Sequence, residues 1–199
     1  MARKKSLEAS GNGPDGRALR GARNRERIVE ALLELVREGE LLPTAEQVSQ
    51  RAGVGTRTVF RHFDDMESLN SEVQAAIKLE IDPLLTEPRS TGNLEQRTRA
   101  MIRRRIAIFE RIAPFMRSGD IQRWNTPFLQ RNHAEDTRRL RADLLKWLPE
   151  LVDADDDRLE ALDLFTSFEA WNRLRVDQRL GRDRTQEVIE AAALAILGK

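Results

Sequence analysis

Residues 44–63 constrain the fold of this chain more than any other segment, because they hold two short helical patterns around a glycine. Thr44 lies three residues before Gln47, the spacing of a capping box, so we expect a helix to begin there. Gly53 provides the backbone freedom that a sharp turn needs, and Thr56 begins a second helix. The segment therefore predicts two short helices joined by a tight turn.

The second of these helices has one obvious apolar pair, Val59 and Phe63, at the spacing that places two side chains on one face. We expect this pair to be buried. The side chains left facing outward are Arg57, Thr58, Arg61 and His62. Arginine and threonine donate to base edges and phosphates, so this pattern favours a helix-turn-helix that sets its second helix into a DNA major groove. The alternative is an αα-hairpin with a solvated polar face.

The rest of the sequence favours an all-α fold, because no stretch alternates at period two and tyrosine is absent. The 34 Lys and Arg residues nearly balance 33 Asp and Glu, so a signal for nucleic acid has to be local. The absence of cysteine excludes disulfides and thiolate metal sites and is compatible with a reducing cytoplasm. No apolar stretch approaches the roughly 18 residues that cross a bilayer, so we expect a soluble cytoplasmic protein without a membrane partner.

The positions of glycine and proline residues, which interrupt helices, divide the chain into three predicted regions. They are a disordered basic arm at residues 1–22, a helix-turn-helix domain at 23–70 and a further helical domain at 71–199. A first helix begins near Arg23 and ends near Gly39. Later helices are expected at about 65–82, 94–117, 126–148, 156–180 and 183–197, with breaks at Pro83, Pro114, Gly119, Pro127, Pro149 and Gly181.

The segment 44–63, TAEQVSQRAGVGTRTVFRHF, resembles the DNA-binding motif of the TetR family, and the resemblance extends over about residues 24–73. Two positions depart from the family pattern. The family often has tyrosine where Phe60 stands and lysine where Met66 stands, and both are usually assigned to phosphate contacts. We therefore expect the basic residues before Ile28 to compensate by following a DNA groove, the alternative being a solubilising tail.

The resemblance implies a transcriptional repressor that acts at the bacterial nucleoid, binds a palindromic operator as a homodimer and is released by a small-molecule effector. It makes the domain at 71–199 a helical effector-binding and dimerisation domain. The expected DNA contacts are Arg23, Arg25, Thr44, Thr56, Arg57, Thr58, Phe60, Arg61 and His62. It also implies a ligand pocket among the helices at about 94–180. The large apolar candidates for its walls are Phe109, Phe115, Trp124, Phe128, Trp147 and Phe165, which suit a cavity or equally a filled core.

The last helices carry apolar residues on more than one face, which is typical of helices that contact both their own subunit and a second copy. The segment 167–175 also resembles the dimer-forming penultimate helix of many family members. The expected dimer contacts are Phe168, Trp171, Arg175, Ile189, Ala193 and Ile196. A fully buried helix of a monomer is the alternative.

Two other classes of protein compete with this interpretation. An enzyme is disfavoured, because the chain has two histidines, no cysteine and no phosphate-binding loop, and we expect no cofactor or metal. A helical architectural protein of the nucleoid would keep the DNA binding without an effector, and it would occupy many weak sites rather than a few palindromes.

Overall fold

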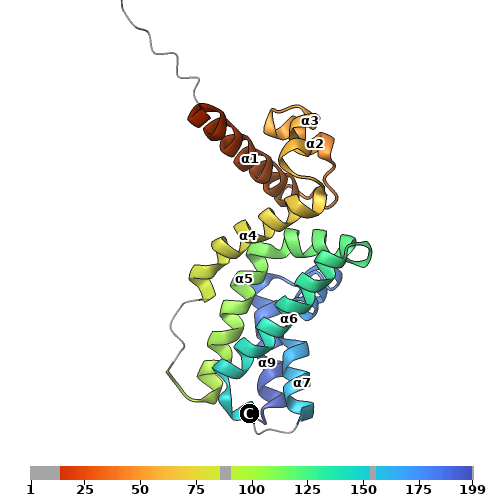
Figure 1. Ribbon diagram of the computed structural model, residues 1–199. Coiled ribbons are helices and arrows are strands. Elements are labelled where there is room, and N and C mark those ends of the chain that lie inside the picture. Colours follow the sequence, from red (N-terminus) through yellow and green to blue (C-terminus); the bar gives the residue numbers. More distant parts are fainter. Residues whose placement is uncertain (1–13, 86–90, 153–155, 199) are drawn as a thin grey trace, which may run out of the picture. The chain divides into compact units, whose positions relative to one another are not determined.

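The computed structural model describes residues 14–85, 91–152 and 156–198, and all regular structure in these ranges is helical. The expectation of an all-α fold is confirmed. The α-helices of the described residues are α1 (Pro14–Arg37), α2 (Ala45–Ala52), α3 (Thr56–His62), α4 (Met66–Leu85), α5 (Leu94–Gln122), α6 (Pro127–Trp147), α7 (Asp156–Phe165), α8 (Phe168–Asn172) and α9 (Arg182–Ile196) (Figure 1). Two short 3₁₀ helices, η1 (Arg123–Asn125) and η2 (Pro149–Leu151), follow α5 and α6, and a π-helix, η3 (Arg173–Asp177), continues α8. The chain divides into two compact units between Gln74 and Ala75, inside α4.

The N-terminal unit packs α1, α2 and α3 together around a small apolar core. Its buried apolar side chains include Ile28, Leu32, Val36, Val48, Ala52, Val59, Phe63, Leu69 and Val73. Ile28, Leu32 and Val36 recur every four residues along α1, and Ala31, Leu33 and Leu35 beside them are also buried, so this helix buries a broad face. The predicted burial of Val59 and Phe63 is confirmed, and it fixes which face of α3 points away from the core.

Residues 14–22 form the beginning of α1, so the prediction of a disordered arm is wrong for this part of the chain. Pro14 is the first residue of the helix, where a missing N–H leaves no hydrogen bond unmade. The run RALR at 17–20 then consists of good helix formers. Their continuity with the packed helix after Ile28 outweighs the nearby glycines, because extending an existing helix needs no new nucleation. The rest of the predicted arm, residues 1–13, lies outside the described residues.

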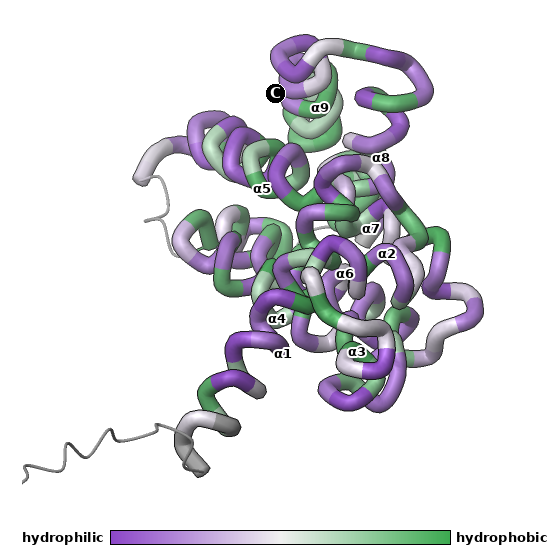
Figure 2. Tube along the Cα trace, turned by 90° about the horizontal axis from the view of Figure 1, so that it is seen from above, coloured by the Kyte–Doolittle hydropathy of each residue, from purple (hydrophilic) through white to green (hydrophobic). Residues whose placement is uncertain are grey.

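The C-terminal unit is organised around α5, which packs against α6, α8 and α9. Its apolar core combines Met101, Ile102, Ile106, Phe109, Ala113, Leu144, Trp147, Leu148, Leu151, Leu162, Phe168, Trp171, Ile189 and Ala193. Hydrophobic stretches run along α9, which contributes two of these residues (Figure 2). Three aromatic rings form its centre, with Phe168 lying 5.6 Å from Phe109 and 5.4 Å from Trp171 between ring centroids. Among the described helices, none combines the length and the apolar character that a membrane crossing requires.

Prolines interrupt the helices less than predicted. We expected breaks at Pro83, Pro114 and Gly119, but α4 continues to Leu85 and α5 runs through to Gln122. A proline inside a helix removes one backbone hydrogen bond and costs about 3 kcal/mol. For α5 this cost is offset by burial on both sides of Pro114, at Ala113 and Phe115. In α4 the proline lies within the last turn, where little helix remains to be disrupted.

The single helix predicted at 156–180 is divided into α7, α8 and η3. Ser167 ends the first piece and caps the next one, because its hydroxyl accepts from the Ala170 N–H at 3.2 Å. The preceding Thr166 is buried and accepts a hydrogen bond from the guanidinium of Arg105 at 2.7 Å. Burial lowers the pKa of Arg105 to about 10, so this arginine stays protonated. Local capping and a buried side-chain bond therefore stop a helix that apolar periodicity alone would continue.

Candidate nucleic-acid interface

The two ends of α2 determine how the chain enters and leaves this helix. The Thr44 hydroxyl accepts from the Gln47 N–H at 3.2 Å, and the Gln47 side chain accepts from the Thr44 N–H at 2.8 Å. At the other end Gly53 has φ 61°, a left-handed conformation, and its N–H donates to the Gln50 carbonyl at 3.1 Å. Both the predicted capping box and the predicted glycine turn are confirmed.

Two threonines expected to contact DNA are engaged within this unit. Thr44 forms the capping box just described, and the Thr56 hydroxyl lies 3.0 Å from that of Ser49. The Ser49 hydroxyl also donates to the Glu46 carbonyl, so it accepts from Thr56. This bond ties the first residue of α3 to the middle of α2. The hydroxyls of Thr44 and Thr56 therefore both stabilise this unit. The spacing of residues in the sequence predicted such a role for Thr44 but not for Thr56.

The outward face of α3 carries Arg57, Phe60 and Arg61. The Phe60 ring is 51% exposed although it is large and apolar, and both arginines are exposed. Within the described part of the chain, neither arginine forms an ion pair with an acidic side chain. Spacings of three and four residues place the three side chains side by side. This face offers two guanidinium forks and an aromatic ring to a partner of opposite charge.

His62 and Thr58 are less available than predicted, since both are half-buried. The His62 ring faces α1, because a Cβ atom added to Gly21 would lie 3.8 Å from the His62 Cε1. Its Nε2 atom is buried and has no hydrogen-bond partner among the described residues. Burial lowers the pKa of His62, and the nearby charges of Arg61 and Arg25 lower it further. The ring is therefore neutral and packed against α1, which contradicts the expectation of an outward donor to a phosphate.

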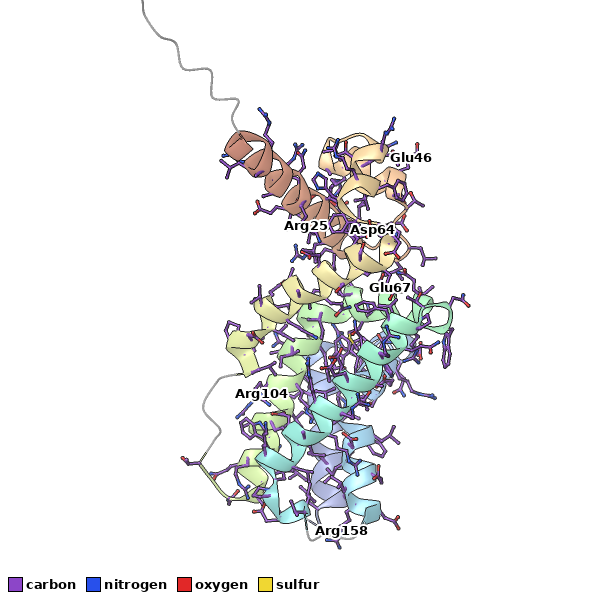
Figure 3. All side chains as sticks on the ribbon, in the orientation of Figure 1. Arg25, Glu46, Asp64, Glu67, Arg104 and Arg158 are labelled. Carbon is purple, nitrogen blue, oxygen red and sulfur yellow. The ribbon has the colours of Figure 1, made fainter. Side chains whose placement is uncertain are left out.

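Arg25 is also turned toward its own unit. Its Nη1 donates to the His62 carbonyl at 2.6 Å, its Nη2 pairs with Glu72 at 2.9 Å, and its guanidinium lies 4.3 Å from the centroid of the Phe63 ring. Figure 3 shows Arg25 and Asp64 near the junction of α3 and α4. The sequence could not predict this structural role of Arg25, because the group that accepts its hydrogen bond is the backbone carbonyl of His62, 37 residues away. Arg23, two residues earlier, is exposed.

The start of α4 has a cap that the sequence analysis missed. Asp65 accepts from the Ser68 N–H at 2.7 Å through its carboxylate, and the Ser68 hydroxyl donates to the Asp65 carbonyl at 2.9 Å. The spacing of Asp65 and Ser68, three residues apart before an apolar stripe, was the available signal. Met66 is the first residue of α4, and its uncharged thioether cannot donate a hydrogen bond to a phosphate.

The six aromatic residues proposed for an effector pocket are not brought together into one site. Phe109, Phe115 and Trp147 are buried in the C-terminal unit, and Phe109 and Trp147 belong to its core. Trp124 is 73% exposed, and Phe165 is also exposed. Phe128 is half-buried. Phe109, Phe115 and Trp147 are therefore buried as the alternative expected, as side chains that fill the protein interior.

The residues proposed for dimer contact belong mainly to the core of one subunit. Phe168, Trp171, Ile189 and Ala193 are fully buried within their own chain, so no face of them is open to a second chain. Arg175 pairs with Glu110 at 2.8 Å and donates to the Leu180 carbonyl at 2.6 Å. Ile196 is half-buried against the core. Phe168 and Trp171 lie on α8, which begins after the break at Thr166 and Ser167, and both side chains belong to the core of the C-terminal unit.

An exposed apolar surface does exist on α7 and α9, which pack against each other. Leu164 is 63% exposed and Phe165 is 46% exposed at the end of α7. Ala191 and Ala195 are exposed on α9, one turn apart. We call these four exposed residues, Leu164, Phe165, Ala191 and Ala195, the α7–α9 apolar face. The first two lie at the C-terminal end of α7, and the two alanines lie in the C-terminal half of α9.

Comparison with solved structures identifies the fold. The chain matches a transcriptional regulator from Rhodococcus sp. RHA1 with a TM-score of 0.66 and 15% identity, over 89% of this chain and 96% of that one. It matches a putative TetR-family transcriptional regulator from Mesorhizobium loti MAFF303099 with a TM-score of 0.65 and 21% identity, over 90% and 97%. A TetR transcriptional regulator from Rhodococcus sp. RHA1 gives 0.52 and 20%, over 87% and 96%.

No family sequence model matches the chain, and no curated protein sequence matches it. The likeness is therefore one of structure, and it covers nearly the whole length of the chain and of each neighbour. This chain has the fold of TetR-family transcriptional regulators. The fold expected from the motif at residues 44–63 is confirmed.

Proposed function

We propose that this protein is a TetR-type transcriptional regulator that reads DNA with the outward face of α3. The observation that carries the proposal is the exposure of Arg57, Phe60 and Arg61 on a short helix whose opposite face is locked by Val59 and Phe63. Arginine forks suit guanine edges or phosphates, and an exposed ring packs against sugar or thymine methyl groups. The overall fold supports the same function.

Exposed basic residues on α1 support a second contact with the DNA backbone. Arg20 and Arg23 lie three residues apart on the N-terminal half of this helix, and both are exposed. We propose that they bind phosphates and compensate for Met66, which has no charge to offer. Because this segment is helical, both charges are held on the surface of α1, and Arg20 does not lie on the disordered arm that we expected at residues 1–22.

The proposed regulator acts as a homodimer on a palindromic operator, since one short helix reads too few bases to select a single genomic site. We propose the α7–α9 apolar face as the surface that joins the two copies. The same proposal includes repression in the cytoplasm, release by a small-molecule effector bound in the C-terminal unit, and no catalytic activity. Release requires an effector that binds the DNA-incompetent state better by a few kcal/mol.

Selection of bound sequences from a random DNA pool tests the proposed function directly. We expect a palindromic consensus, and we expect Arg57→Ala and Arg61→Ala each to lose about 1–3 kcal/mol of binding to it. Arg37→Ala is the matched control, because Arg37 is an exposed arginine in the last turn of α1 that pairs with Glu30. A pool that yields no consensus would support the alternative, an architectural DNA-binding protein.

A further inference from the structure

Arg25 joins three helices of the N-terminal unit through one guanidinium group. It projects from α1, donates to the His62 carbonyl at the end of α3 and pairs with Glu72 on α4. Its planar group also lies 4.3 Å from the centroid of the Phe63 ring. A guanidinium can make these contacts together because its donors diverge in one plane while its face stacks on an aromatic ring.

The contact with His62 addresses a specific weakness of α3. This helix has only seven residues, so several of its carbonyls lack partners within the helix. The Phe63 N–H donates to the Val59 carbonyl, and Arg25 donates to that of His62 at 2.6 Å. A cation at this end also interacts favourably with the helix dipole. Arg25 therefore stabilises the C-terminal turn of α3, the turn that carries Arg61.

Two further contacts hold the Arg25 side chain in this position. The Phe63 ring under it is fully buried, so it is a fixed platform. Glu72 is half exposed and accepts from Nη2 at 2.9 Å, which orients the guanidinium and offsets its charge. Two N–H groups of Arg25 already donate to a carbonyl and a carboxylate, so fewer of them are available to bind a phosphate. Among the described residues, Arg23 has no such acceptors.

We infer that Arg25 is a positioning residue for DNA recognition: it fixes the end of α3 against α1 and α4, and it makes no phosphate contact. This inference rests on the proposed function of α3, and it replaces the sequence-based assignment of Arg25 to the DNA. A positioning residue affects the preference for the selected sequence over random DNA. A phosphate contact affects both affinities equally and changes their dependence on salt.

The test compares Arg25→Gln with Arg23→Gln, on the selected operator and on random duplex DNA over a salt series. For Arg25→Gln we expect the ratio of specific to non-specific affinity to fall about tenfold, with the slope of log K against log salt unchanged. For Arg23→Gln we expect the slope to decrease by about 0.9 and the ratio to stay constant. A lower slope and a constant ratio for Arg25→Gln would overturn the inference.

Arg25→Lys and Glu72→Gln keep the test decisive if Arg25→Gln does not fold, and a double variant extends it if Arg25→Gln does fold. Arg25→Lys keeps the charge but lacks the planar fork, so we expect it to restore only part of the ratio. Glu72→Gln removes the partner carboxylate, which strengthens binding to any DNA but is expected to lower the ratio. In the double variant Arg25→Gln/Glu72→Gln, the loss should be smaller than the sum of the single losses. Full restoration by lysine together with additive losses would contradict the inference.

Hydrogen exchange separates failure of this inference from failure of the proposed function. Without DNA, Arg25→Gln and Glu72→Gln should speed the exchange of the Phe63 amide, which closes the last turn of α3. If the wild type selects no DNA sequence, the proposed function fails, and this exchange rate alone decides whether Arg25 holds α3. Unchanged exchange in both variants would overturn the positioning role.

Discussion

His62 lies at the end of α3 with its ring against α1, close to the charges of Arg25 and Arg61. Burial lowers its pKa below the value of about 6.5 that an unfolded histidine has, and the two arginines add to this effect. Well above pH 6.5 the ring is neutral in both states. Below it, the unfolded chain binds a proton that the folded protein resists, so stability decreases as the pH falls.

We therefore expect the wild type to lose stability relative to His62→Gln as the pH is lowered from 7.5 to 5.5. Glutamine removes the titrating group and keeps a polar side chain of similar length. Urea unfolding at the two pH values measures the difference, and the second histidine, His133, cancels because both proteins contain it. An equal pH dependence in the two proteins would show that His62 does not titrate differently on folding.

At the scale of the elements, the turn between α2 and α3 depends on one backbone conformation. Gly53 has φ 61°, where a side chain costs about 1–2 kcal/mol. A Cβ atom there would also lie 2.8 Å from the Arg27 Nη2, although that flexible side chain can move away. We expect Gly53→Ala to lower the free energy of unfolding of the N-terminal unit by about 1 kcal/mol and to weaken DNA binding, as measured by urea unfolding and a DNA titration.

Gly119→Ala is the matched control for this change. Gly119 lies inside α5, and an added Cβ would meet no described atom within 4 Å apart from those of its chain neighbours and its own helix backbone. Alanine in a helix interior is more stable than glycine by about 0.5–1 kcal/mol, so the same substitution should have the opposite sign there. Loss of stability at both positions would contradict the assignment of the Gly53 effect to its left-handed backbone.

Local signals in the sequence predicted elements whose stabilising contacts are also local. Thr44 with Gln47, and Gly53, act through backbone groups a few residues away, so spacing alone indicated their roles. The division of the segment 156–180 escaped prediction because it depends on Arg105, a residue about 60 positions earlier that binds Thr166. The periodicity of apolar residues indicates which side of a helix is buried. It does not indicate that a side chain distant in the sequence, such as Arg105, will bind Thr166.

At the scale of the whole molecule, the same limit explains why residues expected at a dimer interface lie in the core of their own chain. Phe168 and Trp171 are apolar residues near Leu164 and Phe165, and composition cannot distinguish which pair faces the core. The three-dimensional arrangement does so, because the break at Ser167 turns α8 inward and leaves the end of α7 exposed. The candidate site was predictable on α3, where burial of one pair of residues defines the opposite face, but it was not predictable where two apolar faces compete.

The α7–α9 apolar face supports the last prediction, that Leu164→Glu/Phe165→Glu converts a dimer into a monomer. Four carboxylates at a two-fold contact would repel one another and lose their hydration, since an isologous interface meets its own copy. Sedimentation at micromolar concentration should show half the wild-type mass, and affinity for a full palindrome should fall at least about tenfold. Ile121→Glu is the control, because Ile121 is an exposed apolar residue near the end of α5. A wild type that sediments as a monomer, or a double variant that stays dimeric, would remove this face from the proposed assembly.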